Sequence, residues 1–329
     1  MEADGGRVTP ICLLRPRWHN RAVKDLTVNS GEATLAVRDF GGEGQSLVLL
    51  HGLGRTLADW SVIGPLLAQR HRTVAFDIRC HGESADGRWS WDAAVSDIDA
   101  VSHELGLNTR AVVGHSLGGM IAVMWGKVHP EATGVVNLDG HGKRVISQYV
   151  GIGPDEAEQR VAAAEARTKA ALAALSGPLP PAMVDGLRAQ QRALAARFGA
   201  PESMFVESTD RMLRAGADGQ TFLRPSPTGI GASMLADAEQ FDMFRLYREV
   251  LCPVLIVAGT EPDPGADPEL MATYRQGLRI DLNRVARELP NLTVEFIDGG
   301  HGLLFEHPGE LVEQISGFLN TRQPRIDVS

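Results

Sequence analysis

The sequence has few cysteines, no block of basic residues and no long apolar run. Its 329 residues include three cysteines, Cys12, Cys80 and Cys252, which lie far apart and form no CxxC or Cys/His pattern. This spacing disfavours a structural zinc site, so we expect no bound metal. A sparse, odd number of cysteines is typical of a reducing compartment, and we expect the protein to be cytoplasmic.

Two further absences narrow the class of partner. No apolar run approaches the roughly 20 residues that span a bilayer, and the N-terminal stretch has acidic residues early and no apolar segment typical of a signal peptide. The formal net charge is −9 and lysine and arginine form no cluster, which disfavours nucleic acid as a partner. We therefore expect neither a membrane nor a nucleic-acid partner, and we interpret residues 1–24 as an N-terminal arm. Neither the charge nor any motif indicates an oligomeric state.

Short apolar runs alternate with helical patterns along most of the chain. Runs such as Ser46–Leu50, Gly134–Asp139 and Pro253–Gly259 are typical of strands that are buried on both faces. Near the start, Asp25–Ser30 and Ala33–Asp39 flank a Gly-Glu pair, which predicts a hairpin. The alternation predicts an α/β fold: a mostly parallel sheet with helices on both faces.

The alternation is interrupted in the middle of the chain. Residues 142–250 contain no strong strand pattern, but alanine-rich segments such as Pro181–Gly199 begin at proline and end at glycine, as helices do. Because a strand pattern resumes afterwards, we interpret residues 142–250 as a helical cap inserted into one core. That core comprises residues 25–141 and 251–329.

The stretch VVGHSLGGM, residues 112–120, contains the pattern G-x-S-x-G with Ser116 at its centre. It follows a strand pattern and precedes a helical one, which is the context that this motif requires. A serine on such a sharp turn lies at a helix N-terminus, where backbone amides favour developing negative charge. Ser116 is therefore a candidate nucleophile, and the alternative is a capping serine in an ordinary turn.

A second candidate element follows the run Ser46–Leu50. The next residues are His51, Gly52 and Leu53, and a glycine here lets the backbone approach a ligand closely. The amide of Leu53 could donate to an oxyanion together with the amide of Leu117, the residue after Ser116. A buried histidine bonded to backbone is an equally common interpretation of His51.

Taken together, these stretches resemble the α/β-hydrolase superfamily over nearly the whole chain outside its first residues and the helical insertion. The matching stretches occur in the superfamily's order: HGLG, FDIRCHGES, GHSLGG, PVLIVAGTEPDP and GGHGLLFEHP. The resemblance implies an eight-stranded, mostly parallel sheet with an inserted helical cap that acts as a lid. In the superfamily's segment D-x-R-G-x-G-x-S, Cys80 replaces the first glycine, a departure that affects the loop's conformation and no catalytic group.

The resemblance also implies a catalytic histidine and an acid. His301 lies on a glycine-rich loop just after the last strand pattern, at the position of the superfamily's histidine. The acid is expected between serine and histidine in the chain. The loop that follows Gly259 offers Glu261 and Asp263, and relatives that carry the acid one strand earlier point to Asp139. We favour Asp263, then Asp139, then Glu261.

A serine, a histidine and an acid beside two amide donors are suited to acyl transfer. We therefore expect hydrolysis of an ester, thioester or lactone of a small to medium, largely apolar molecule, without a cofactor. The alternatives are a C–C bond hydrolase, a cofactor-free perhydrolase or a lyase or cyclase on the same scaffold, and a receptor that does not hydrolyse its ligand. The candidate pocket residues are His51, Gly52, Trp60, Met120 and His141.

Overall fold

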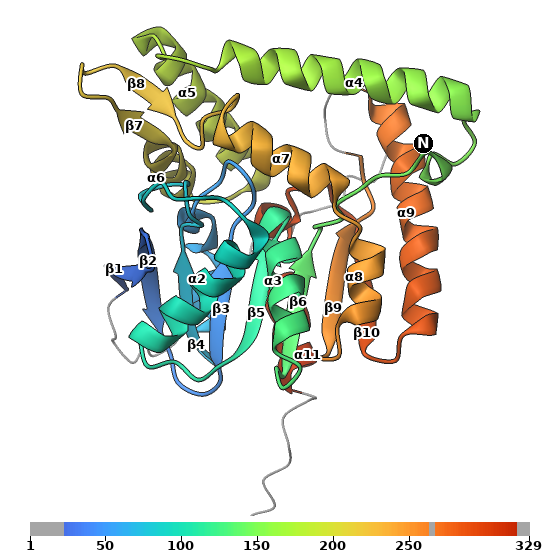
Figure 1. The fold of residues 1–329 in the computed structure, drawn as a ribbon, viewed down its shortest axis with the longest axis horizontal. Helices are drawn as coiled ribbons and strands as arrows, with labels where there is room; N and C mark the ends of the chain where they lie inside the picture. The colour runs from blue at the N-terminus through green and yellow to red at the C-terminus, as the bar shows by residue number, and fades with distance from the viewer. Residues whose placement is uncertain (1–22, 263–266, 321–329) are drawn as a thin grey trace, which may run out of the picture.

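A large mixed sheet forms the centre of the protein (Figure 1). The computed structural model describes residues 23–262 and 267–320. Its strands are β1 (Lys24–Ser30), β2 (Ala33–Gly41), β3 (Ser46–Leu50), β4 (Arg72–Phe76), β5 (Thr109–His115), β6 (Gly134–Leu138), β7 (Leu213–Ala215), β8 (Thr221–Leu223), β9 (Val254–Gly259) and β10 (Leu292–Ile297). Eight of them form one sheet in the order β1-β2-β4-β3-β5-β6-β9-β10. Only β1–β2 and β2–β4 pair antiparallel within it, which confirms the predicted mostly parallel, eight-stranded sheet.

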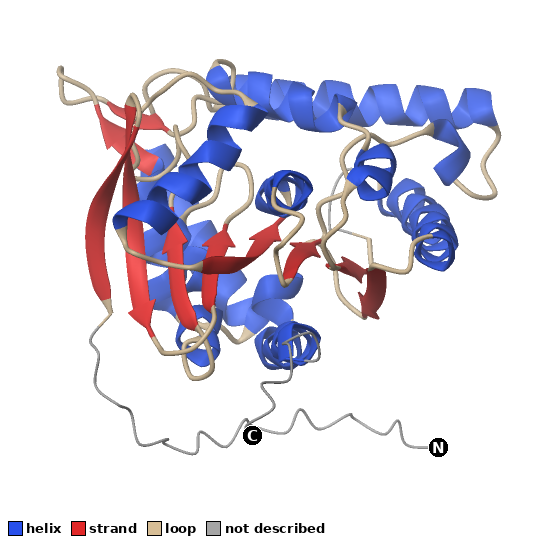
Figure 2. Cartoon of the chain, turned by 60° about the horizontal axis from the view of Figure 1, so that its bottom comes forward, coloured by secondary structure: helices blue, strands red, loops and turns tan. Residues whose placement is uncertain are grey.

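Helices cover both faces of this sheet (Figure 2). The α-helices are α1 (Ile63–Leu67), α2 (Trp91–Glu104), α3 (Leu117–Val128), α4 (Pro154–Ala174), α5 (Pro181–Phe198), α6 (Glu202–Met212), α7 (Ile230–Gln240), α8 (Met243–Glu249), α9 (Pro268–Glu288), α10 (Leu303–Glu306) and α11 (Pro308–Asn320), with short 3₁₀ turns at Leu57–Trp60 and Ile146–Gln148. Buried residues of α2, α3, α8 and α9 join one apolar cluster, and those of α1 and α11 join another.

The apolar runs of the sequence explain the two clusters. All five residues of β3 are buried. Because successive side chains of a strand point to opposite faces, Val48 and Leu50 enter the cluster below α3, whereas Leu47 and Leu49 enter the cluster below α11. A strand with two buried faces therefore has no polar alternation, as the sequence predicted.

The segment between β6 and β9 forms the helical insertion. In Figures 1 and 2, α4 runs across the molecule above the carboxyl ends of the central strands, with α7 close by over α3. The insertion also contains the antiparallel pair β7–β8, which the sequence analysis did not predict. Each of these strands has three residues, too few for a period-two pattern to be distinguished from a loop.

The last helix that the sequence analysis assigned to the insertion packs against the core. Leu246 and Tyr247 of α8 are buried in the same cluster as α3. Asp242 begins this helix by accepting a hydrogen bond from the backbone amide of Arg245. The chain therefore returns to the core before residue 250, at the turn between α7 and α8.

Polar contacts join the insertion to the core below it. Arg211 of α6 pairs with the buried Asp77 at 2.7 Å, and Ser208 donates to Asp59 at 3.0 Å. Cys80, in the same region, has φ 68°. It thus adopts a left-handed backbone conformation that favours glycine, at a cost of about 1 kcal/mol for a residue with a Cβ.

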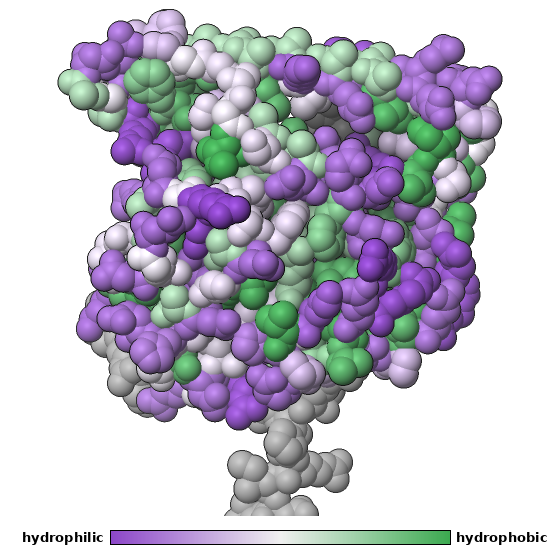
Figure 3. Space-filling model, in the orientation of Figure 1, coloured by the Kyte–Doolittle hydropathy of each residue, from purple (hydrophilic) through white to green (hydrophobic). Residues whose placement is uncertain are grey.

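The face of the protein drawn in Figure 3 is largely polar. On the face drawn in Figure 3, hydrophilic residues predominate and hydrophobic ones lie among them. Within residues 23–262 and 267–320, no helix combines the length and the apolar character that a membrane span requires.

Candidate active site

Ser116 occupies a strained turn between β5 and α3. Its φ of 54° and ψ of −118° are rare for a residue with a side chain, and such strain is concentrated at functional sites. The flanking glycines make the turn possible. A Cβ on Gly114 would lie 2.0 Å from the carbonyl oxygen of Gly118, and one on Gly118 would lie 2.4 Å from that of Leu50. The strand-turn-helix context predicted for the motif is therefore present.

His301 lies on the loop between β10 and α10. Its Nδ1 donates to Oδ2 of Asp139 at 2.7 Å, and its side chain is 41% exposed. The buried ring of His115 supports this loop, since its Nε2 donates to the carbonyl oxygen of His301 at 2.8 Å. Burial lowers the pKa of His115 to about 4, which keeps this supporting ring neutral.

Asp139 follows β6 and is buried, with a φ of 55°. Arg275 of α9 binds it through both nitrogens, at 2.6 Å to Oδ1 and 2.9 Å to Oδ2. Oδ1 also accepts from His141 Nε2 at 2.8 Å and from the amide of Gly259 at 3.1 Å. Burial by itself would raise the pKa of Asp139. The hydrogen bonds from His141 and His301 and the charge of Arg275 hold it well below its ordinary value.

The three candidate acids are placed differently. Asp139 contacts His301, as described above. Glu261 is exposed, and only its backbone amide makes a described hydrogen bond, to the carbonyl oxygen of Gly299. Asp263, which the sequence analysis favoured, lies outside the described residues. Because His301 Nδ1 carries one proton and donates it to Asp139, the geometry supports the alternative that was ranked second.

A cavity of about 250 Å³ brings the candidate residues together. Its lining includes Ser116, Asp139 and His301, together with Leu53 and Leu117, the two residues whose amides were predicted to bind an oxyanion. Gly52 lies directly below the serine, since a Cβ there would be 3.1 Å from the Cβ of Ser116. A side chain at this position would therefore press on the serine, and glycine lets the chain pass close to it without that contact.

Of the other residues predicted to line the pocket, the structure places some in the cavity lining and others in the core. Met120 and His141 line the cavity. His51 and Trp60 do not, because both side chains are fully buried in the core. The Nε2 of His51 accepts from the amide of Ile78 at 2.9 Å, and burial lowers the pKa of this histidine to about 4. The structure therefore places His51 and Trp60 in the core beneath the loop and not in the cavity lining.

The sequence analysis missed several residues of this cavity, among them two arginines. Arg275 sits next to Tyr274 in the apolar stripe of α9, and a cation on a buried face was a usable signal. Arg144 follows the insertion's start, and its guanidinium lies 5.0 Å from the ring centre of Tyr274. With Glu239 of α7 also in the lining, the cavity mixes charged and apolar walls, whereas a largely apolar pocket was expected.

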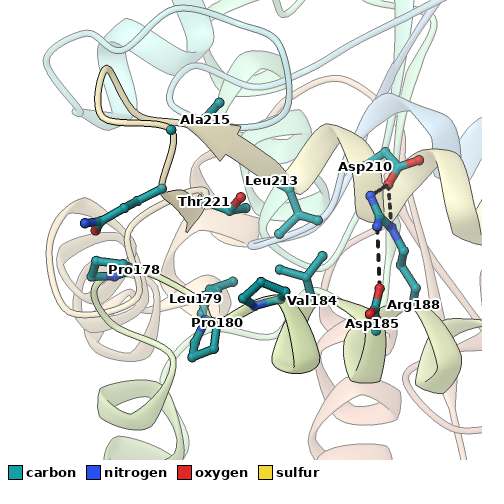
Figure 4. A pocket seen from close by; sticks show the side chains of 13 residues that line it. Pro178, Leu179, Pro180, Val184, Asp185, Arg188, Asp210, Leu213, Ala215 and Thr221 are labelled. Carbon is teal, nitrogen blue, oxygen red and sulfur yellow. Dashed lines mark hydrogen bonds and ion pairs between the residues drawn. The ribbon is translucent and has the colours of Figure 1, made fainter.

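A larger hollow, about 800 Å³, lies within the insertion and away from these residues. In Figure 4, Leu179, Pro180 and Val184 face Leu213 across it, and Arg188 bonds to Asp210 at its edge. No candidate catalytic residue lines it. We therefore place the candidate active site in the smaller cavity. Within the part of the chain that the structure describes, no group of three or more His, Cys, Asp or Glu side chains is arranged to hold a metal ion.

The chain belongs to the alpha/beta hydrolase family, whose sequence pattern matches residues 47–314. A solved structure of E-2-(acetamidomethylene)succinate hydrolase superposes with a TM-score of 0.66 at 24% identity, covering 91% of this chain and all of the other. The magnesium-chelatase 30 kDa subunit of Rhodobacter capsulatus is 26% identical over 79% of this chain and 81% of its own length.

A shorter match is found to the dihydrolipoyllysine-residue acetyltransferase component of the acetoin cleaving system of Pseudomonas putida. It is 32% identical over 34% of this chain. The chain spans about a third of that relative's length. The family and the fold are thus defined, and the residues that line the cavity are the guide to the reaction.

Proposed function

We propose that this protein is a serine hydrolase of small carboxylic esters, thioesters or lactones. The observation that carries the proposal is that Ser116, on its strained turn, shares one small cavity with His301, whose ring is held by Asp139. In this assignment Asp139 takes the place of Asp263 as the acid. Its carboxylate fixes the histidine tautomer, so that Nε2 is free of a proton and can accept one from the serine.

The reaction proceeds in two halves. Ser116 Oγ attacks the carbonyl carbon as its proton passes to His301 Nε2, and the oxyanion that forms accepts from the amides of Leu53 and Leu117. Neither amide has a hydrogen-bond partner among the described residues. The imidazolium then protonates the leaving alkoxide or thiolate, which departs and leaves an acyl-serine. Water, deprotonated by the same histidine, releases the acid and regenerates the serine.

The cavity limits the size of the substrate. Its volume of about 250 Å³ lies below the roughly 300–1,000 Å³ of typical small-molecule sites. Leu53, Met120 and Leu235 supply apolar wall, and Arg144 and Glu239 supply charge. We therefore expect short acyl groups with polar substituents to be preferred over long hydrocarbon chains.

Kinetics on p-nitrophenyl esters with acyl chains of two to about twelve carbons test the proposal. We expect turnover that is greatest for the shortest chains, and a loss of about 10³-fold or more in kcat for Ser116→Ala. Ser61→Ala, outside the cavity lining, is the matched control and should retain activity. Turnover that survives Ser116→Ala unchanged would exclude the mechanism.

A second candidate function follows from one relative. One relative that is matched over most of its length is named as a subunit of magnesium chelatase, so a protein of this fold that binds a ligand without hydrolysing it is the alternative. In that case the chain would bind small molecules in the same cavity and turn over none of the esters, and Ser116→Ala would bind them equally well.

A further inference from the structure

Asp139 holds a second imidazole besides His301. His141 Nε2 lies 2.8 Å from Oδ1, and His301 Nδ1 lies 2.7 Å from Oδ2. His141 comes from the loop after β6 and His301 from the loop after β10. Both residues line the cavity that contains Ser116. Only one histidine is needed to activate the serine, so the mechanism above leaves His141 unused.

The contact with Asp139 fixes the tautomer of His141. A carboxylate is an acceptor only, so the nitrogen that faces it must carry the proton. That nitrogen is Nε2, and in a neutral ring Nδ1 then carries a lone pair. No residue within the described part of the chain donates a hydrogen bond to His141 Nδ1. Since the ring lines the cavity, His141 Nδ1 can accept a hydrogen bond from a substrate bound there.

The surroundings of His141 favour its neutral form. Burial lowers the pKa of His141 and is the largest influence on it, exceeding the opposing charge and hydrogen bond of Asp139. Arg275 and His301 make smaller contributions of the same sign as burial. Arg275 also already balances the charge of Asp139. When His301 takes up the proton of Ser116, Asp139 already contacts two cations, Arg275 and His301, and a third cation at His141 becomes still less favourable. His141 therefore remains an acceptor throughout the reaction.

We propose that His141 Nδ1 is a substrate-binding acceptor, and that the preferred substrates are small esters or lactones carrying a hydroxyl or amide N–H that donates to it. This inference rests on the proposed function and adds a substrate class to it. The reason for selectivity is physical: a buried acceptor that loses its partner is costly, so an analogue without the donor is disfavoured. The small cavity restricts the donor to within a few bonds of the carbonyl group.

Two variants distinguish the roles of the two ring nitrogens of His141. The terminal atoms of glutamine lie three bonds from Cβ, as Nε2 does, so His141→Gln retains a donor to Asp139 and loses the acceptor. The terminal atoms of asparagine lie two bonds from Cβ, as Nδ1 does, so His141→Asn retains an acceptor and loses the contact with Asp139. His129→Gln is the control, because His129 pairs with Asp99 at 3.1 Å and is not part of the cavity lining.

The assay compares p-nitrophenyl butyrate with the 2-hydroxybutyrate, the 3-hydroxybutyrate and the N-acetylglycinate esters. Each kcat/KM is divided by the rate of that ester with hydroxide, which removes intrinsic reactivity. We expect at least one donor-bearing ester to exceed butyrate about ten-fold or more with the wild-type protein and with His129→Gln. The ratio of the corrected kcat/KM of the donor-bearing ester to that of butyrate should fall to about one in His141→Gln and stay high in His141→Asn. This expectation holds even if the absolute rates of both variants change.

The outcomes are distinguishable. A wild-type ratio near one for every donor-bearing ester, or a ratio that His141→Gln leaves unchanged, overturns the role of His141 while ester hydrolysis by Ser116 stands. Equal losses on all esters in His141→Gln and His141→Asn would make His141 only a support for Asp139. Absence of turnover on every ester, or turnover that survives Ser116→Ala, would instead contradict the proposed function itself.

Discussion

Replacing Asp139 by asparagine is the most informative perturbation of the candidate site. Five donors reach this carboxylate: three meet Oδ1 and two meet Oδ2. An asparagine keeps one oxygen, and it loses fewest hydrogen bonds if that oxygen takes the position of Oδ1. Its amide nitrogen then faces His301 and forces Nδ1 to accept, which places the imidazole proton on Nε2.

In that tautomer His301 cannot receive the proton of Ser116. We expect kcat on a short p-nitrophenyl ester to fall about 10⁴-fold, as for other triads that lose the tautomer-fixing acid, which corresponds to about 5 kcal/mol in the activation barrier. The cost in stability should be smaller, about 1–3 kcal/mol, because the new oxygen still accepts from Arg275. Urea unfolding followed by circular dichroism measures this second quantity separately.

Asp263→Asn is the matched comparison. If Asp139 is the acid, Asp263→Asn should change kcat by less than about ten-fold, far below the loss expected for an acid of the triad. A larger loss in Asp263→Asn than in Asp139→Asn would refute the assignment and restore the acid that the sequence analysis favoured.

Three further predictions concern stability and are checked by urea unfolding. Gly118→Ala should destabilise the fold by about 2 kcal/mol or more because its Cβ would meet backbone oxygens of Leu50 and His51. Gly317→Ala is the control: it has open space around it in α11 and should be neutral or slightly stabilising. Equal changes in the free energy of unfolding for the two variants would contradict this packing. Arg275→Met should cost about 3–5 kcal/mol because it leaves Asp139 buried without its cation, and a cost below about 1 kcal/mol would refute that pairing. The pKa of His115 is about 4 in the folded protein and 6.5 in the unfolded chain, so as the pH falls the unfolded chain binds this proton first. The contribution of His115 to stability is therefore fully present above about pH 6.5 and is lost as the pH falls toward 4. The loss from this residue should reach about 3 kcal/mol. His115→Gln should show a correspondingly shallower decline, and an unchanged slope would show that His115 does not contribute.

The fold was predictable because its signals are local. The buried strands are short continuous apolar runs, and the motif around Ser116 lies directly between a strand pattern and a helical pattern in the sequence. The insertion was visible as a loss of strand pattern between two such runs. Two features were too short to recognise: the three-residue strands β7 and β8, and the turn that returns α8 to the core.

The carboxylate that contacts His301 was harder to predict because this contact depends on distances across the sheet. In the chain, Asp139 comes directly after β6 and Asp263 comes four residues after the end of β9, and the sequence alone does not say which carboxylate meets His301. Arg275 lies 136 residues from Asp139 in the chain, and only the packing of α9 against β10 and the turn Ile146–Gln148 brings its guanidinium to the carboxylate. Long-range pairings of this kind leave no periodic pattern in the sequence.

Labelling with a serine-directed fluorophosphonate tests the central claim most directly, because it needs no knowledge of the substrate. The account predicts one covalent adduct per chain, located by peptide mass mapping on Ser116, forming in step with the loss of esterase activity and absent in Ser116→Ala. A stoichiometric adduct on another residue, or full esterase activity after Ser116 has been labelled, would contradict it.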